Sequence, residues 1–497
     1  MQADVCLILE GTYPYISGGV SNWAHSLVLA QKHLSFHLLC ILPPNAKLNY
    51  RFELPKNVVG VTNLFLQNLP KESFSFSRQE SEKLFKSLEV PLLNLQHKAT
   101  LQRLKYILET LKGSQKIPGR SVLLDSEGAW NMLIRMYLST MGESSFLNYF
   151  WSWRGLLASF YSILLAKIPA AQVYHTLCTG YAGLFTARAY LETNKPCLLT
   201  EHGIYANERR IEITSANWLD DQKAFNLNIE SKHFDRDLKD YWIDTFLGYS
   251  QMCYQACESL ITLYEGNKDL QVADGADPKK IRIIPNGIDF ELYSKVQRKP
   301  SSVPTVALIG RVVPIKDVKT FIRAIAILKE KIPAVQALIL GPTDEDEDYF
   351  AECQDLVNQN QLDQTIVFTG KVSISKYLEN IEVVVLTSIS EGQPLVVLEA
   401  GAAGIPSVTT DVGACSEIIS GRSDENPPLG KGGCVSYLAN PVSTAESLYR
   451  LLSDREFYQQ CSQTIQKRVY KYYNETDLNQ AYAAIYQSLT EKERANK

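Results

Sequence analysis

The alternation of apolar runs and helical stretches after residue 300 constrains the fold of this 497-residue chain more than any other feature. Each apolar run has the length and the β-branched content of a strand, and each is followed by a stretch with helical periodicity. Continuous apolar strands joined by helices form parallel sheets with right-handed crossovers. The pattern predicts a Rossmann-like α/β domain. Its predicted strands are residues 305–309, 335–340, 365–368, 383–386 and 407–409, and its predicted helices are residues 318–328, 349–358, 395–403 and 443–452.

The first half of the chain shows the same alternation less regularly. Its predicted strands are residues 3–9, 36–41, 172–177, 197–200, 259–263 and 281–284. A charged, mostly helical segment at about 65–150 interrupts the rhythm, and residues 83–111 within it have the pattern of one helix. We therefore expect an α/β protein with two Rossmann-like, doubly wound domains and a helical insertion in the first.

The division of the chain follows from the composition of its segments. The first domain is expected over residues 1–297 and the second over residues 303–469. Residues 298–302 (RKPSS) are polar and contain a proline, which is typical of a linker. Residues 470–497 form a polar C-terminal helix that is expected to pack back on the first domain. Ligands of open α/β sheets bind beyond the carboxyl ends of the strands, so candidate residues should follow strands.

Charge and cysteine spacing exclude several classes of protein. The net charge of −4 and the pI of about 6.1 leave no broad positive field, so nucleic acid is not expected as a main partner. The ten cysteines include no CxxC pair, and the closest two, Cys253 and Cys257, have helical spacing. Zinc sites and disulfide scaffolds use tighter or more regular pairs. We expect buried thiols in a reducing cytoplasm.

The sequence contains no segment that we expect to cross a membrane or to direct secretion. The chain starts with the apolar run at 3–9, without a basic region or a cleavage site. The most apolar helical stretch, residues 146–171, is interrupted by Arg154 and Lys167, which leaves the twelve uncharged residues 155–166. That length is too short for about 30 Å of hydrocarbon. A core helix is predicted, and a docking surface for a membrane partner is the alternative.

Two glutamates, Glu391 and Glu399, bracket an apolar stretch in residues 390–400 (SEGQPLVVLEA). Eight helical residues rise about 12 Å, whereas the two carboxylates of a glycosidase lie roughly 5–9.5 Å apart. The spacing favours carboxylates that bind different hydroxyl groups of a long ligand. Pro394 suits a first helical turn, and the free N–H groups of residues 392–396 offer an anion site. Two solvated glutamates are the alternative.

A basic loop, residues 310–317 (GRVVPIKD), follows a predicted strand. Lys316 stands near a helix N-terminus, where the dipole disfavours a cation by about 0.3–1 kcal/mol, and Asp317 can cap that helix. A cation in this position suggests an anion nearby. Arg311 supplies a planar fork and Lys316 a point charge, which together suit a diphosphate. An exposed basic loop without a ligand is the alternative.

Two loops of the first half also follow predicted strands. Residues 11–20 (GTYPYISGGV) contain the adjacent glycines Gly18 and Gly19, which let the backbone approach a phosphate or a sugar. Residues 201–210 (EHGIYANERR) are expected to form a polar, charged loop, and this position makes His202 a candidate site residue. A plain strand–helix turn and a structural histidine are the respective alternatives.

The acidic run at 344–348 (DEDED) contains the DxD spacing that is found in some metal sites. It follows a predicted strand and opens a helix, where the helix dipole stabilises carboxylates. We expect it to cap that helix, and no required metal is predicted.

These motifs, in this order, resemble retaining glycosyltransferases of family 4, which have the GT-B fold with two Rossmann-like domains facing each other across a cleft. The C-terminal half carries residues 285–289 (PNGID), the basic loop, residues 368–371 (FTGK) and the E-x7-E glutamates. The N-terminal half, with residues 10–20 (EGTYPYISGGV), the insertion and residues 201–210, is similar to the cytosolic glycosyltransferases of Pel exopolysaccharide systems.

The resemblance implies a role for each matched position. Arg311 and Lys316 would hold the donor diphosphate, and Glu399 would bind the ribose hydroxyls. Glu391 would face the transferred sugar, and His202 would contact that sugar near the reacting carbon. Except for Glu399, these residues form the implied catalytic set. The other implied donor positions are Gly18 and Gly19 over the phosphate, Lys371 and Val372 beside the nucleobase, and Gly392, Gln393, Pro394 and Leu395 against the sugar; the acceptor-side candidates are Tyr205, Arg209 and Arg210.

The resemblance also implies the reaction. A hexose would move from a UDP-sugar, either UDP-glucose or a UDP-N-acetylhexosamine, to a growing exopolysaccharide, without a metal or other cofactor. The protein would be cytoplasmic, and docking to inner-membrane synthase or export subunits would hold it at the membrane. A hydrolysing UDP-sugar epimerase of the same fold and a non-catalytic nucleotide-sugar-binding scaffold are the alternatives. The hexose, the linkage, the acceptor length, the oligomeric state and the role of the insertion at 65–150 stay open.

Overall fold

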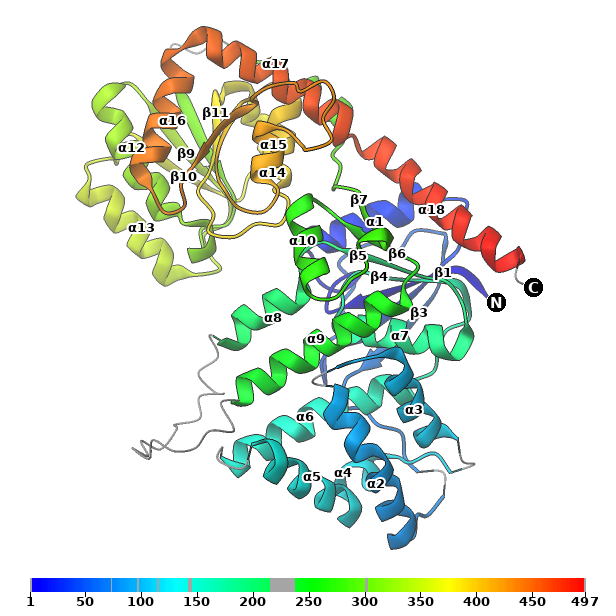
Figure 1. Cartoon of the computed structure of the whole chain (residues 1–497). Coiled ribbons are helices and arrows are strands. Elements are labelled where there is room, and N and C mark those ends of the chain that lie inside the picture. Colours follow the sequence, from blue (N-terminus) through cyan, green and yellow to red (C-terminus); the bar gives the residue numbers. More distant parts are fainter. Residues whose placement is uncertain are drawn as a thin grey trace. The chain divides into compact units, whose positions relative to one another are not determined.

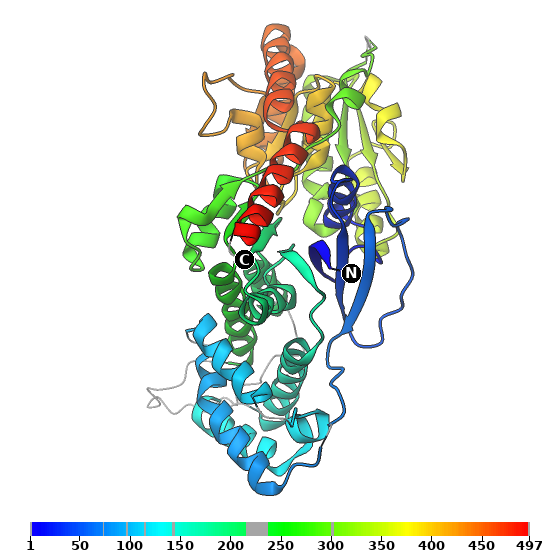
Figure 2. The same cartoon turned by 90° about the vertical axis from the view of Figure 1, so that its right-hand side faces the viewer.

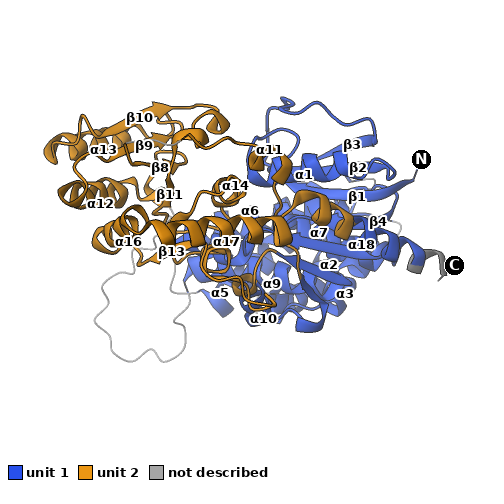
Figure 3. Cartoon of the chain, turned by 90° about the horizontal axis from the view of Figure 1, so that it is seen from above, with its two compact units in different colours: residues 1–262, 268–282, 483–497 blue, residues 263–267, 283–482 orange. Residues whose placement is uncertain are grey.

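The computed structural model describes residues 2–72, 74–95, 98–113, 116–141, 145–214, 237–299 and 303–495. The chain forms two compact units, which Figure 3 colours separately. Unit 1 comprises residues 1–262, 268–282 and 483–497, and unit 2 comprises residues 263–267 and 283–482. Of the segment expected as a linker, residues 300–302 lie outside the described residues.

Unit 2 begins at residue 283, before the boundary expected at 297. The reason is the backbone of Ile288, whose N–H donates to Tyr473 O at 2.9 Å and whose C=O accepts from Glu475 N at 3.0 Å. These bonds join Ile288 to residues 473 and 475, which belong to unit 2. The C-terminal helix α18 (Glu475–Ala495) belongs to unit 2 up to residue 482 and to unit 1 from residue 483.

Unit 1 contains a seven-stranded sheet in the order β3-β2-β1-β4-β5-β6-β7. The pairings from β3 through β6 are all parallel. The chain order reverses between β1 and β4, and in such sheets this switch point is where ligands bind. The strands are β1 (Ala3–Glu10), β2 (Phe36–Leu42), β3 (Val58–Phe65), β4 (Ala171–Thr176), β5 (Cys197–Glu201), β6 (Ser259–Thr262) and β7 (Ile281–Ile283).

Unit 2 contains a six-stranded parallel sheet in the order β10-β9-β8-β11-β12-β13, so its switch point lies between β8 and β11. The prediction of two Rossmann-like parallel sheets is therefore confirmed. The strands are β8 (Thr305–Ile309), β9 (Gln336–Leu340), β10 (Ile366–Gly370), β11 (Val383–Leu386), β12 (Ser407–Thr410) and β13 (Gly433–Ser436).

Alternate residues along the strands of unit 2 fill separate cores on its two faces. In β8, Val306 and Leu308 pack in one apolar cluster with α12 and α16. The intervening Ala307 and Ile309 pack in a second cluster with Ala400 of α14. Because both faces of each strand are buried, the strands read as continuous apolar runs rather than alternating ones. The helices of this unit are α11 (Phe290–Ser294), α12 (Val318–Lys331), α13 (Glu347–Gln359), α14 (Leu395–Ala402), α15 (Cys415–Ser420), α16 (Pro441–Ser453) and α17 (Arg455–Tyr472), and α10 (Glu265–Ala273) is divided between the two units.

The helices between β3 and β4 gather at one end of unit 1, the lower end in Figure 1 and again in the turned view of Figure 2. The single helix expected at 83–111 is wrong: α2 ends at Leu95, and Thr100 caps a second helix by accepting from Arg103 N. The helices of unit 1 are α1 (Gly19–Ala30), α2 (Arg78–Leu95), α3 (Leu101–Lys112), α4 (Arg120–Asp125), α5 (Glu127–Thr140), α6 (Phe146–Leu165), α7 (Tyr181–Thr193), α8 (Tyr205–Thr214) and α9 (Leu238–Ala256).

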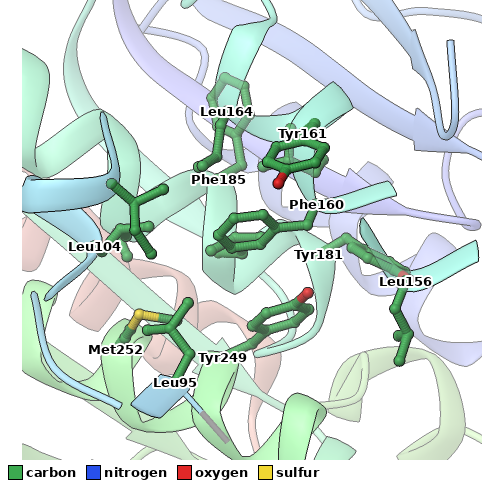
Figure 4. Close-up of a cluster of buried hydrophobic side chains, with 14 of the residues drawn as sticks. Leu95, Leu104, Leu156, Phe160, Tyr161, Leu164, Tyr181, Phe185, Tyr249 and Met252 are labelled. Carbon is green, nitrogen blue, oxygen red and sulfur yellow. The ribbon is translucent and has the colours of Figure 1, made fainter. Parts of the chain in front are cut away.

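The inserted helices share one apolar core with the sheet of unit 1. Figure 4 shows Phe160 of α6 beside Tyr249 of α9, whose rings stack at 6.2 Å between centroids, and Leu95 of α2 packs in the same cluster. The expectation of a core helix near residues 146–171 is confirmed, since twelve residues of α6 are buried. In the part of the chain that the structure describes, no helix has the length and apolar character to cross a membrane.

A buried histidine joins α18 to the sheet of unit 1. Nδ1 of His175 lies 2.7 Å from the hydroxyl of Tyr486, and its Nε2 lies 2.9 Å from Oγ1 of Thr200. Burial, with a smaller contribution from His202, lowers the pKa of His175 to about 3. The folded state therefore favours neutral imidazole. The stability that this preference confers is complete above the unfolded pKa of about 6.5 and is lost as the pH falls toward 3.

We expect the free energy of unfolding to fall more steeply with decreasing pH in the wild type than in His175→Gln between pH 6.5 and 4. The expected difference in slope is up to about 1.4 kcal/mol per pH unit, because the glutamine does not titrate. Urea denaturation at several pH values measures it. Parallel curves for His175→Gln and the wild type would contradict the assignment.

Candidate functional site

The switch point of unit 2 brings together two of the predicted site residues. Lys316 lies in the segment between β8 and α12, and Glu391 lies between β11 and α14. The Nζ atom of Lys316 is 2.5 Å from Oε1 of Glu391, and the two side chains are only 20% and 13% exposed. A largely buried ion pair costs desolvation energy on folding. Its position at the switch point makes it the candidate site for a charged ligand.

Hydrogen bonds from neighbouring loops fix the backbone around Lys316. The hydroxyl of Thr387 donates to the carbonyls of Lys316 and Asp317 at 3.0 Å each, and Ile389 N donates to Ile315 O at 2.8 Å. Asp317 adopts a left-handed conformation with φ 44° and accepts from Thr320 N at 3.2 Å. The predicted capping role of Asp317 is confirmed.

The loop that carries Glu391 is equally constrained. The hydroxyl of Ser388 donates to Oε1 of Glu391 at 2.5 Å, and Ala414 N donates to Gly392 O at 2.8 Å. Gly413 packs against this loop with φ 55°, and a Cβ there would lie 2.2 Å from Gly392 O. Only glycine satisfies both the conformation and the contact.

A side chain of the same loop binds the backbone of the PNGID motif. Gln393 accepts from Asn286 N at 2.7 Å and donates to Asn286 O at 2.9 Å. The following Pro394 is the N-cap of α14, so the helix begins at Leu395, as expected, and ends at Ala402, one residue earlier than expected. Glu391 and Gly392 therefore lie a few residues before the N-terminus of α14, where a helix dipole favours an anion.

Glu399 lies inside α14 and is the second carboxylate of the E-x7-E motif. Burial raises its pKa, and a hydrogen bond with Tyr293 opposes that shift. The pKa of Tyr293 is raised by burial and by the same carboxylate. A partly buried carboxylate with a tyrosine partner suits the binding of neutral hydroxyl groups.

The remaining donor-side candidates of unit 2 lie on its surface or in its core. Arg311 is 53% exposed and pairs with Glu345 at 2.6 Å, a partner that the sequence did not suggest. Lys371 follows β10 and is exposed, and Val372 packs against the apolar cluster beneath.

In the acidic run, Asp346 caps α13 by accepting from Tyr349 N at 3.0 Å, as predicted. Among the described residues, no group of three or more His, Cys, Asp or Glu side chains is arranged to hold a metal ion.

In unit 1, β5 ends at a buried carboxylate beside the predicted histidine. Glu201 accepts four hydrogen bonds, from Thr179, Tyr205 N, Tyr254 and Gln271, at 2.8–3.1 Å. Burial raises the pKa of Glu201. These bonds fix the side chain of Glu201, the residue directly before His202.

The ring of His202 packs against Trp23 of α1, with 4.6 Å between their centroids. Burial lowers the pKa of His202 to about 4, so its imidazole is neutral near pH 7. A neutral imidazole can both donate and accept a hydrogen bond. Gly18 is the N-cap of α1 and Gly19 its first residue, and a Cβ at either would meet no described atom within 4 Å.

The expectation of a polar loop through residue 210 is wrong from Tyr205 onward, where α8 begins. Tyr205 donates to Oε1 of Glu10 at 2.7 Å, and the guanidinium of Arg209 lies 5.0 Å from the centroid of the Tyr205 ring. With Trp242 and Phe246 of α9, these side chains line a cavity of about 610 Å³. Arg210 is exposed on α8 and does not line this cavity.

The role of Glu10 was not predicted. It is the last residue of β1, at the switch point of unit 1, and its Oε2 accepts from Ala182 N at 2.9 Å. The sequence did offer one signal for Glu10. It is an acidic residue at the end of a strand, and it stands directly before Gly11 of a strand–helix loop. Trp242 and Phe246 carried no such signal, because they belong to a helix far along the chain.

Two family models together match most of the chain. Residues 3–279 match the family described as "Domain of unknown function (DUF3492)", and residues 289–468 match "Glycosyl transferases group 1". The D-inositol 3-phosphate glycosyltransferase of Paenarthrobacter aurescens (strain TC1) is 29% identical over 195 residues, which are 36% of this chain and 47% of that protein. The N-acetyl-alpha-D-glucosaminyl L-malate synthase of Bacillus anthracis is 24% identical over 228 residues, 44% of this chain and 56% of that protein.

The chain spans about half the length of the curated relatives it matches. Among solved structures, Anabaena Alr3699/HepE in complex with UDP aligns with a TM-score of 0.59 at 13% identity, covering 98% of this chain and 100% of that one. At 13% identity, this structural similarity establishes the fold alone. The fold is of the GT-B type, with two parallel-sheet domains. The chain therefore has the GT-B fold and belongs to the family described as Domain of unknown function (DUF3492), and its residues 289–468 match the glycosyl transferases group 1 model.

Proposed function

We propose that this protein is a retaining, metal-independent glycosyltransferase that moves a hexose from a UDP-sugar to a growing exopolysaccharide. The observation that carries the proposal is the largely buried pair of Lys316 and Glu391 at the switch point of unit 2, beside the N-terminus of α14. HepE, a GT-B structure of the same overall fold, was solved with UDP. A diphosphate at this switch point would be stabilised by an ammonium group and by free helix-end amides.

The reaction breaks the bond between the anomeric carbon of the donor sugar and the β-phosphate oxygen. Negative charge grows on the departing UDP, and Lys316 stabilises that charge in the transition state. Arg311 would leave its exposed pair with Glu345 to bind the same diphosphate. The oxygen of an acceptor hydroxyl forms the new bond on the same face of the sugar, and its proton passes to the departing phosphate. This route retains the anomeric configuration.

Carboxylates on either side of the diphosphate would position the rest of the donor. Glu399, partly buried in α14, would accept hydrogen bonds from the ribose hydroxyls, and Glu391 would face the transferred sugar. Lys371 and Val372 would lie beside the nucleobase. His202 in unit 1, neutral at pH 7 because its pKa is about 4, would contact the sugar by hydrogen bonding rather than by charge.

The exopolysaccharide role rests on the motifs of the N-terminal half. The segments at 10–20 and 201–210 resemble those of cytosolic Pel glycosyltransferases, and we propose the same setting here. The enzyme would act in the cytoplasm, docked on membrane subunits of a synthase or export complex.

A donor screen tests the proposal. UDP release is measured with UDP-glucose, UDP-N-acetylglucosamine and UDP-N-acetylgalactosamine, with and without oligosaccharide acceptors, and the products are identified by mass spectrometry and NMR. The expected result is an acceptor-dependent release of UDP from one donor and an α-linked product. Free UDP with an epimerised sugar in the absence of acceptor would indicate a hydrolysing epimerase instead. UDP binding without turnover of any donor would indicate a non-catalytic scaffold.

A further inference from the structure

The backbone around His202 in unit 1 is held on both sides of this residue. His202 follows the last residue of β5, and Tyr205 N donates to Oε1 of Glu201 at 3.1 Å, which closes the loop that contains it. A Cβ at Gly203 would lie 2.1 Å from Oε1 of Glu208 on α8, so the loop also packs closely against that helix. The main freedom left to His202 is therefore the rotation of its side chain.

The ring of Trp23 limits that rotation. It packs against the ring of His202 with 4.6 Å between centroids and 76° between planes, an edge-to-face arrangement. The Trp23 ring also lies 6.4 Å from that of His175, at 85°. His175 is itself held between the hydroxyls of Tyr486 and Thr200. Trp23 thus packs beside both a histidine that is fixed in the sheet and the histidine predicted as a site residue.

The place of Trp23 on α1 argues against a purely structural role. The buried face of this helix consists of Ser21, Ala24, Leu27 and Val28, whereas Trp23 is half-buried. A core role would place so large an apolar side chain on the buried face. Its contact with a candidate site residue gives it a different role.

We infer that Trp23 positions the imidazole of His202, holding it in the orientation in which it meets the transferred sugar. The inference rests on the proposed function, in which His202 contacts that sugar. Trp23 acts through His202 and does not itself touch the substrate. Such positioning affects the rate more than the affinity, because a displacement of about 1 Å costs up to roughly 10²-fold in rate.

The rate of sugar transfer by Trp23→Ala tests the inference. The kcat should fall about tenfold or more, while the donor KM and the affinity for UDP stay within about twofold of the wild-type values. Trp23→Phe keeps an aromatic ring against His202 and should recover most of the rate. Trp151→Ala, which removes an exposed tryptophan of α6, should transfer sugar as the wild type does.

A double variant separates positioning from general damage. If Trp23 acts through His202, the combination of Trp23→Ala with His202→Gln should be no slower than His202→Gln alone. Losses that multiply in the double variant, or a wild-type kcat in a folded Trp23→Ala, would overturn the inference. Trp23→Leu, which keeps more apolar volume, replaces Trp23→Ala if thermal unfolding shows that the alanine variant is not folded.

NMR titration of the histidine rings tests the contact without any activity. Burial lowers the pKa of His202 to about 4 in the wild type. Loss of the Trp23 ring exposes the imidazole, so the pKa of His202 should rise in Trp23→Ala toward the ordinary value of about 6.5. His202→Gln identifies the signal by its absence.

The two proposals fail in different ways. An unchanged pKa of His202 in Trp23→Ala would overturn the positioning role, even in a protein that transfers sugar. A raised pKa in a protein that turns over no donor would support the contact between Trp23 and His202 and overturn the glycosyltransferase.

Discussion

Replacing Lys316 by alanine is expected to reduce the rate of sugar transfer by about 10²–10³-fold, equivalent to roughly 2.7–4 kcal/mol. Under the proposed function, the ammonium of Lys316 stabilises charge that develops on the departing diphosphate, and no second lysine lies against Glu391 among the described ion pairs. The loss should appear mainly in kcat, since the charge on the leaving group grows in the transition state. The rate of UDP release in the presence of acceptor is the measurement.

A matched control separates this effect from a general loss of charge. Lys329 lies on α12, and its Nζ donates to Gln361 O on the surface, so Lys329→Ala should keep wild-type activity. Ser388 still donates to Glu391 in Lys316→Ala, which limits the structural damage. Transfer by a folded Lys316→Ala at a rate within a few-fold of wild type would contradict the proposed role of this residue.

The Arg468→Met variant is expected to lose about 3–5 kcal/mol of stability. Arg468 and Glu425 are 0% and 3% exposed and share two hydrogen bonds of 3.0 Å. The guanidinium also donates to the carbonyls of Ile418 and Ile419. Removing Arg468 leaves a buried carboxylate and buried carbonyls without these donors.

Urea denaturation, with hydrogen exchange of peptides from unit 2, measures the change. The control is Arg78→Met, which breaks an exposed pair with Glu127 and should cost no more than about 1 kcal/mol. Equal losses in the two variants would show that burial does not determine the contribution of Arg468. Because the chain has two compact units, the peptide-level signal assigns the loss to the unit that carries the substitution.

Much of the fold could be predicted because buried parallel strands leave a strong signal. The predicted strand at 305–309 has the observed bounds of β8, and the runs at 383–386 and 407–409 differ from β11 and β12 by at most one residue. β3 was missed because it lies at the sheet edge with partly exposed residues and contains Gly60. β13, four residues beginning with Gly433, is too short for a periodic pattern.

The candidate site was predictable where each site residue belongs to a recognisable motif. Lys316 and Glu391 were assigned to one donor site from two separate motifs, and the structure brings them into contact. The partner of Arg311, Glu345, was not predicted, because an exposed ion pair leaves no pattern in the sequence. Glu10 and Trp242 line the same cavity because β1 and a helix far along the chain come together in the fold. Local periodicity in the sequence does not reveal such an arrangement.

The most direct test is a crystal structure of the protein with bound UDP. The diphosphate should lie at the carboxyl ends of β8 and β11, with an oxygen within hydrogen-bond distance of Lys316 Nζ and the ribose hydroxyls at Glu399. UDP bound elsewhere on the molecule, or a switch point of unit 2 that stays empty at saturating UDP, would contradict the account.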